Sequence, residues 1–118
     1  MVETMKALVF TAPYTFEYRD VPCPHPAPDE VLVEVKACAV CGSDVHGSSG
    51  ENGRRIPPLV MGHEASGTIA QLGEAVQGWA VGDRVTFDST EYCGHCWFCT
   101  HGMHNLCAHR HILGEACT

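Results

Sequence analysis

Four cysteines in the C-terminal part of this 118-residue sequence are spaced as metal ligands. They form a C-x2-C-x2-C-x7-C pattern at Cys93, Cys96, Cys99 and Cys107. Four soft thiolates this close in sequence can close around one tetrahedral ion. A complete thiolate set leaves no coordination position for water or substrate, so the pattern predicts a structural zinc site rather than a catalytic one.

Iron–sulfur ligation is the main competing interpretation of this pattern. Bacterial ferredoxins also use C-x2-C-x2-C, but their fourth cysteine follows after three residues and precedes a proline. Here seven residues separate Cys99 from Cys107, and Ala108 follows. Disulfides or free thiols are the other alternative, although short CxxC spacings suit metals better than disulfide geometry. Five histidines lie nearby in the sequence: His95, His101, His104, His109 and His111. We expect their side chains to be solvated or to lie next to the ligand thiolates without binding the metal.

A second group of possible ligands lies at the ends of two predicted strands. Cys41 directly follows an apolar alternating segment, and His63 and Glu64 precede another. Any one of these side chains alone is more often packed or solvated than bound to a metal. Because strand ends can meet at one edge of a sheet, their combination predicts a second cluster of Cys41, His63 and Glu64.

The elements that would position both groups are short β-strands. Apolar residues alternate with Glu34 and Lys36 in the segment 31–37, which is typical of a half-buried strand. Pro22 to Pro28 predict an extended surface connection, and the Gly- and Ser-rich residues 47–55 predict a mobile loop. Further strands are expected at 5–10, 16–21, 65–72 and 83–87. The predicted fold is therefore mainly β with almost no helix, as in a curved sheet or partly open barrel.

Four blocks of the sequence resemble the medium-chain zinc-dependent alcohol dehydrogenases, and the polyol dehydrogenases of the sorbitol type look nearest. The blocks, in family order, are Lys36 to His46, Gly62-His63-Glu64 with Gly67, Gly82-Asp83-Arg84-Val85, and the four-cysteine lobe. The resemblance spans nearly the whole chain. It implies a GroES-like, partly open β-barrel with an irregular zinc-binding lobe at residues 92–108. Residues 1–118 are then expected to be a truncated part of that catalytic domain.

The resemblance also implies roles for the second cluster. Cys41 and His63 would be ligands of a catalytic zinc ion, and Glu64 either a direct ligand or an exchangeable carboxylate nearby. Zinc would act as a Lewis acid on the substrate oxygen, so that the alcohol loses its proton near neutral pH and can release hydride.

Proton transfer would use the residues that follow Cys41. By the resemblance, the Ser43 hydroxyl would take the substrate proton and His46 would relay it to solvent. The competing interpretation is that both are ordinary polar loop residues, which are common after a strand. Asp44 is a candidate to orient a zinc ligand.

The implied activity is oxidation of a secondary alcohol or polyol to a ketone or aldehyde, with NAD or NADP accepting the hydride. The sequence has no G-x-G-x-x-G between a strand and a helix, so the cofactor-binding Rossmann domain is expected elsewhere in the full-length parent. The chain alone is expected to be inactive, and the parent to be a homo-oligomer. Two alternatives remain open: a non-catalytic zinc-binding module that uses only the cysteine lobe, and a GroES-like interaction protein.

Composition narrows the environment and the partners. The net charge is −7, and the seven Lys and Arg residues are scattered along the sequence, so no basic surface for binding nucleic acid is expected. No apolar run approaches the length of a membrane span, and no signal peptide is recognisable. We therefore expect a cytoplasmic protein that does not bind a membrane. Cys38 is expected to pack, because a redox CxxC with Cys41 belongs near a βαβ pattern that is absent here. Cys23 and Cys117 are expected to be free thiols.

Overall fold

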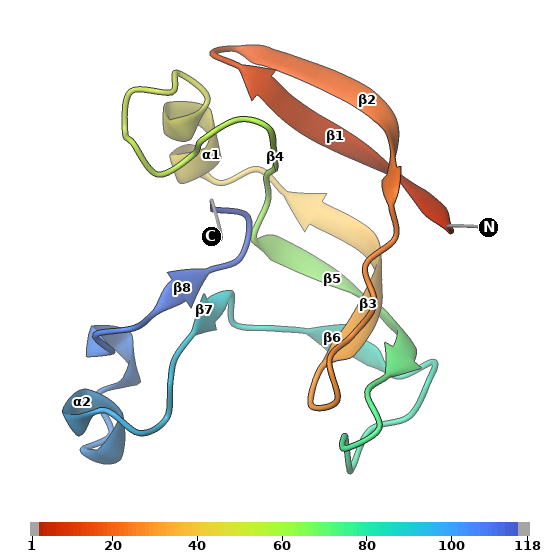
Figure 1. Cartoon of the computed structure of the whole chain (residues 1–118), viewed down its shortest axis with the longest axis vertical. Helices are drawn as coiled ribbons and strands as arrows, with labels where there is room; N and C mark the ends of the chain where they lie inside the picture. Colours follow the sequence, from red (N-terminus) through yellow and green to blue (C-terminus); the bar gives the residue numbers. More distant parts are fainter. Residues whose placement is uncertain (1–2, 116–118) are drawn as a thin grey trace.

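The computed structural model describes residues 3–115 as three small antiparallel sheets with short helical turns between them (Figure 1). The strand orders are β2-β1-β4, β3-β5-β6 and β7-β8. In chain order the elements are β1 (Thr4–Ala12), β2 (Thr15–Pro22), β3 (Val31–Ala39), α1 (Gly42–Gly47), β4 (Leu59–Val60), β5 (Glu64–Leu72), β6 (Arg84–Thr86), β7 (Thr90–Glu91), α2 (Trp97–Thr100), the 3-10 helix η1 (His104–Leu106) and β8 (His111–Ile112). The predicted fold class, mainly β with few helices, is confirmed.

The first two strands form a hairpin and lie close to the expected segments 5–10 and 16–21. β1 pairs with β2 from Thr4 opposite Pro22 to Phe10 opposite Phe16, and a tight turn at residues 13–14 joins them. The rings of Phe10 and Phe16 lie 5.5 Å apart between centroids. Phe10 is fully buried, and the buried apolar residues of the chain also include Val9 of β1 and Ile69 of β5. This aromatic pair fixes the register of the hairpin at its turn end.

β3 forms where the alternating pattern predicts a strand, but its burial pattern differs from the prediction. Two register shifts interrupt its pairing with β5, one between Leu32 and Val33 and one between Val35 and Ala37. The first shift leaves Ala70 of β5 without a partner in β3, and the second leaves Lys36 of β3 without a partner in β5. Val31 and Val35 both precede the extra residue in β3 and are 36% and 54% exposed, so the predicted apolar face of this strand is only partly buried.

The pairing of β3 with β5 brings the two predicted ligand segments together. Ala39 at the end of β3 lies opposite Glu64 at the start of β5. Because the strands are antiparallel, the residue that follows β3 and the residue that precedes β5 lie at the same edge of the sheet. Cys41 and His63 therefore meet, although 22 positions separate them in the sequence.

Local patterns did not predict the short elements. Residues 42–47 form helix α1 directly after Cys41, and turns follow through the Gly- and Ser-rich segment. The lobe contains the one-turn helices α2 and η1, and β7 and β8 pair at its base (Figure 1). Within residues 3–115 no helix has the length and apolar character to cross a membrane. Cys117 lies outside the described residues.

Candidate metal centres

The four predicted lobe cysteines converge on one point. Their ligand atoms all lie within 4.8 Å of one another. Four of the sulfur–sulfur distances are 3.5 Å for Cys96–Cys99, 3.6 Å for Cys93–Cys107, 3.9 Å for Cys96–Cys107 and 4.0 Å for Cys93–Cys99. A tetrahedral zinc ion with Zn–S bonds of about 2.3 Å requires sulfur–sulfur edges of about 3.8 Å. The cluster therefore fits a single tetrahedral ion.

Backbone N–H groups point at the lobe sulfurs. Cys96 N donates to Cys93 Sγ at 3.3 Å, and Cys93 N donates to Cys107 Sγ at 3.4 Å. His109 N also donates to Cys107 Sγ at 3.3 Å. Hydrogen bonds to sulfur favour the thiolate form, which is the form that binds a metal.

The pKa values of the lobe thiols are shifted in opposite directions: those of Cys96 and Cys107 are lowered, and that of Cys99 is raised. Hydrogen bonds from the backbone of Cys99 and then Ala108 lower the pKa of Cys96 to about 6. The backbone of Cys93 also lowers the pKa of Cys107. Burial raises the pKa of Cys99 to about 12, because an uncompensated thiolate is poorly solvated there. A bound divalent cation would supply the missing charge and allow all four thiolates.

Three of the lobe histidines make contacts with aromatic rings or backbone oxygens. The ring of His101 stacks on Trp97 at 4.2 Å, and His104 stacks on Tyr92 at 4.1 Å. His95 Nδ1 lies 2.8 Å from the carbonyl oxygen of Cys93. Aromatic stacking and backbone contacts thus occupy these rings.

The second predicted cluster also forms. The ligand atoms of Cys41, His63 and Glu64 lie within 4.8 Å of one another. Gly62 precedes His63 with φ of +112°, and a Cβ there would approach Cys38 Sγ to 2.9 Å. Only glycine suits both that dihedral angle and that contact. Cys38, predicted to pack, is exposed, but its sulfur lies against this turn.

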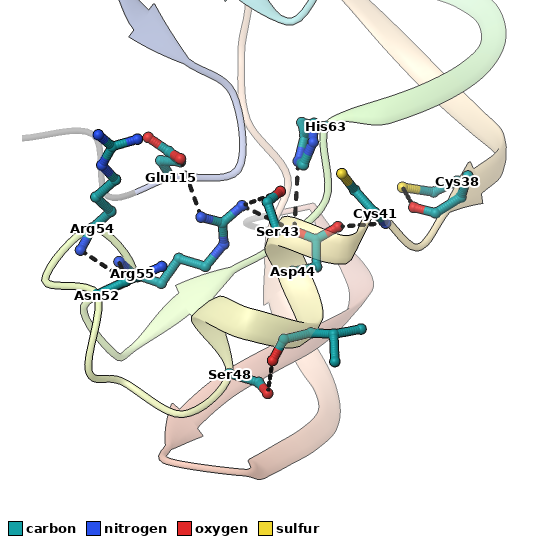
Figure 2. A network of polar contacts seen from close by, with 12 residues as sticks. Cys38, Cys41, Ser43, Asp44, Ser48, Asn52, Arg54, Arg55, His63 and Glu115 are labelled. Carbon is teal, nitrogen blue, oxygen red and sulfur yellow. Dashed lines mark hydrogen bonds and ion pairs between the residues drawn. The ribbon is translucent and has the colours of Figure 1, made fainter.

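Asp44 links two members of this cluster. Its Oδ2 accepts a hydrogen bond from the backbone N–H of Cys41 at 3.1 Å, which caps the first turn of α1. Its Oδ1 lies 3.5 Å from His63 Nδ1 (Figure 2). That nitrogen is buried and has no hydrogen-bond partner within the described residues. A carboxylate beside one imidazole nitrogen leaves the other for a metal, so the thiol, imidazole and carboxylate set fits zinc.

Ser43 and His46 lie on the exposed side of α1. They are three residues apart in one helix and so project from neighbouring positions. Ser43 Oγ accepts a hydrogen bond from Arg55 at 3.3 Å. His46 lines an open hollow with Tyr14, whereas His63 and Glu64 line a different one beside β3 and β5. The structure therefore groups the three predicted ligands but leaves His46 outside the hollow that His63 and Glu64 line.

Sequence reasoning missed Arg55 and Glu115. Arg55 lies in the turn-rich segment after α1, and Glu115 lies close to the end of the described chain. Arg55 is buried, and its guanidinium bonds Ser43, Asp44 and Glu115 (Figure 2). No local pattern marks either residue, because an Arg among Gly, Asn and Ser is normally solvated.

The comparisons with known proteins define the class. The family model of the alcohol dehydrogenase GroES-like domain matches residues 27–117. The chain therefore belongs to this family, and the predicted resemblance to zinc-dependent alcohol and polyol dehydrogenases is confirmed.

Individual relatives agree with this family. The chain is 47% identical over 114 residues to a sorbitol dehydrogenase of Halalkalibacterium halodurans, covering 94% of this chain and 33% of the relative. It is 37% identical to an L-threonine 3-dehydrogenase of Pyrococcus horikoshii, and the match covers 97% of this chain and 34% of that relative. The chain thus spans about a third of the length of the curated relatives that it matches.

Solved structures share the fold. A cobalt- and zinc-bound thermostable alcohol dehydrogenase of Pyrobaculum aerophilum superimposes with a TM-score of 0.87 at 29% identity, covering 97% of this chain and 36% of that one. An alcohol dehydrogenase of Escherichia coli CFT073 in complex with NADH superimposes with a TM-score of 0.85 at 38% identity. The match covers 94% of this chain and 32% of that one.

Proposed function

We propose that the protein containing this chain is a zinc-dependent, NAD- or NADP-dependent dehydrogenase that oxidises a secondary alcohol or polyol to a ketone or aldehyde. Residues 1–118 would form part of its GroES-like catalytic domain, with the structural zinc lobe at residues 92–108. The nicotinamide-binding Rossmann domain would lie outside this chain. Small alcohols or polyols are the proposed substrates, and a cytoplasmic homo-oligomer is the proposed form.

The observation that carries this proposal is the presence of two ligand clusters of different chemistry in one small domain. Four thiolates close completely around one point in the lobe, which suits a structural ion. Cys41, His63 and Glu64 offer sulfur, nitrogen and oxygen, and His63 and Glu64 line an open hollow, which suits an ion that keeps a position for substrate. A zinc-binding module without catalysis would need only the first cluster.

Each group of the second cluster then has a proposed task. Cys41, His63 and Glu64 would hold a zinc ion, which supplies Lewis acidity toward the substrate oxygen. Ser43 Oγ would take the hydroxyl proton of the substrate as it releases its own hydroxyl proton toward His46. The exposed ring of His46, one turn further along α1, would pass that proton to solvent.

Metal analysis together with turnover tests this proposal in the intact protein. Wild type is expected to hold two zinc ions and to reduce NAD or NADP with a polyol. Cys41→Ser and His63→Ala should each lose one zinc and all activity, while the lobe zinc stays. Cys23→Ser is the matched control and should change neither. A fully active Cys41→Ser enzyme would contradict the proposal, and a single zinc bound only in the lobe would favour the non-catalytic module.

A further inference from the structure

Arg55 is the most buried charged side chain among the described residues, and nothing in its local sequence explains this. Its side chain is 1% exposed and lies between two carboxylates. Nη2 lies 3.1 Å from Asp44 Oδ1, and Nη1 lies 3.1 Å from Glu115 Oε1. A buried guanidinium is stable only when it is paired and hydrogen-bonded, so both carboxylates stabilise it.

The surrounding backbone is shaped to hold this side chain. Gly47 at the end of α1 has no Cβ, and a Cβ there would stand 2.2 Å from Arg55 Cδ. Gly114 packs against Gly62 so closely that a Cβ would stand 2.1 Å from the Gly62 carbonyl oxygen. The second contact seats the segment after β8 against the turn before His63, which places Glu115 beside Arg55 (Figure 2).

Arg55 reaches the candidate ligands through Asp44. One oxygen of this carboxylate accepts the N–H of Cys41, and the other faces both Arg55 and His63. A carboxylate that was free to rotate about χ2 could not hold both contacts at once. The same guanidinium nitrogen donates to Ser43 Oγ, which leaves the Ser43 hydroxyl proton to point elsewhere.

We infer that Arg55 is a positioning residue of the Cys41–His63–Glu64 cluster, which it orders by locking the carboxylate of Asp44, with Glu115 balancing its charge. This inference rests on the proposed function, because it assumes that the cluster binds a metal. A lysine could not replace Arg55, because an ammonium lacks the planar fork that reaches both carboxylates.

Zinc affinity of the second site, measured in the intact protein by competition with a chelator, tests the inference. Arg55→Met should weaken that site by about 10- to 100-fold, the range found when groups that orient a ligand are removed. The lobe zinc should keep its affinity. Arg84→Met is the matched control, because Arg84 is exposed and its side chain makes no hydrogen bond or ion pair with the other residues of 3–115. Its zinc affinities should equal those of wild type.

A double variant separates positioning from general stabilisation. Because Arg55 acts through Asp44, adding Arg55→Met to Asp44→Asn should weaken zinc binding little further. Equal zinc affinity in Arg55→Met and wild type, or fully additive losses in the double variant, would overturn the inference while leaving the proposed function intact. If Arg55→Met does not fold, Arg55→Lys takes its place, and wild-type affinity in that variant overturns the inference. A wild-type protein without a second zinc would overturn the proposed function and this inference together.

Discussion

Asp44 Oδ1 lies 3.5 Å from Nδ1 of His63, and these two residues come from separate elements, helix α1 and the turn before β5. Both side chains are 11% exposed. In this low-dielectric position the carboxylate selects the orientation and tautomer of the imidazole, which decides the nitrogen that remains for a metal.

Asp44→Asn should weaken zinc binding at the second site by about 10- to 100-fold, since the amide keeps the shape but loses the charge that orients His63. Zinc content after dialysis against a graded chelator series measures this. Asp29→Asn, at an exposed position, is the control and should behave as wild type. Unchanged affinity in Asp44→Asn would show that His63 is oriented by other groups.

Cys93→Ser or Cys107→Ser should remove the lobe zinc and unfold the lobe, because metal binding and folding are linked in a segment with so little core of its own. Elemental analysis gives the zinc loss, and the fluorescence of Trp97, 61% exposed beside His101, reports the lobe structure. Cys23→Ser should leave both unchanged. Iron with acid-labile sulfide in the wild-type protein would contradict the zinc assignment.

While the lobe still keeps its fold after rapid removal of zinc, its thiols should show unequal reactivity with pH. Because the pKa of Cys96 is lowered from 9.0 to about 6, its thiolate persists above pH 6, and its alkylation rate should fall as the pH drops through that value. The pKa of Cys99 is raised to about 12, so this thiol should stay unreactive through pH 9. Iodoacetamide labelling read by peptide mass spectrometry checks both, with a free cysteine derivative as reference. Equal rates at both thiols would contradict the prediction.

Phe10→Ala should lower the free energy of unfolding by about 3–5 kcal/mol, because it empties a fully buried position packed on Phe16. Leu8→Ala on the same strand is the matched control, since Leu8 is 55% exposed, and it should cost about 0.5 kcal/mol or less. Urea denaturation of both variants measures the difference. A similar loss in the two would mean that the core lies elsewhere.

The sequence predicted the long strands but not the irregularities in their pairing or the short helix. The hairpin of β1 and β2 and the long strands β3 and β5 follow from alternation and turn residues. The register shifts between β3 and β5 could not be predicted, because they depend on how the two strands pair rather than on the residues of either strand alone. Helix α1 was missed because six residues are too few to show helical periodicity.

The sequence by itself determined the lobe cluster, because three of its cysteines lie within seven residues and the chain between them cannot separate their sulfurs far. That the cluster holds zinc stays a prediction. Only the tertiary structure decided the surroundings of Cys41 and His63, since antiparallel pairing of β3 with β5 brings the two residues to one edge. The same holds for Arg55 and Glu115, which are 60 positions apart. Contacts at such separation depend on how all the intervening elements pack, and no local preference of either residue encodes them.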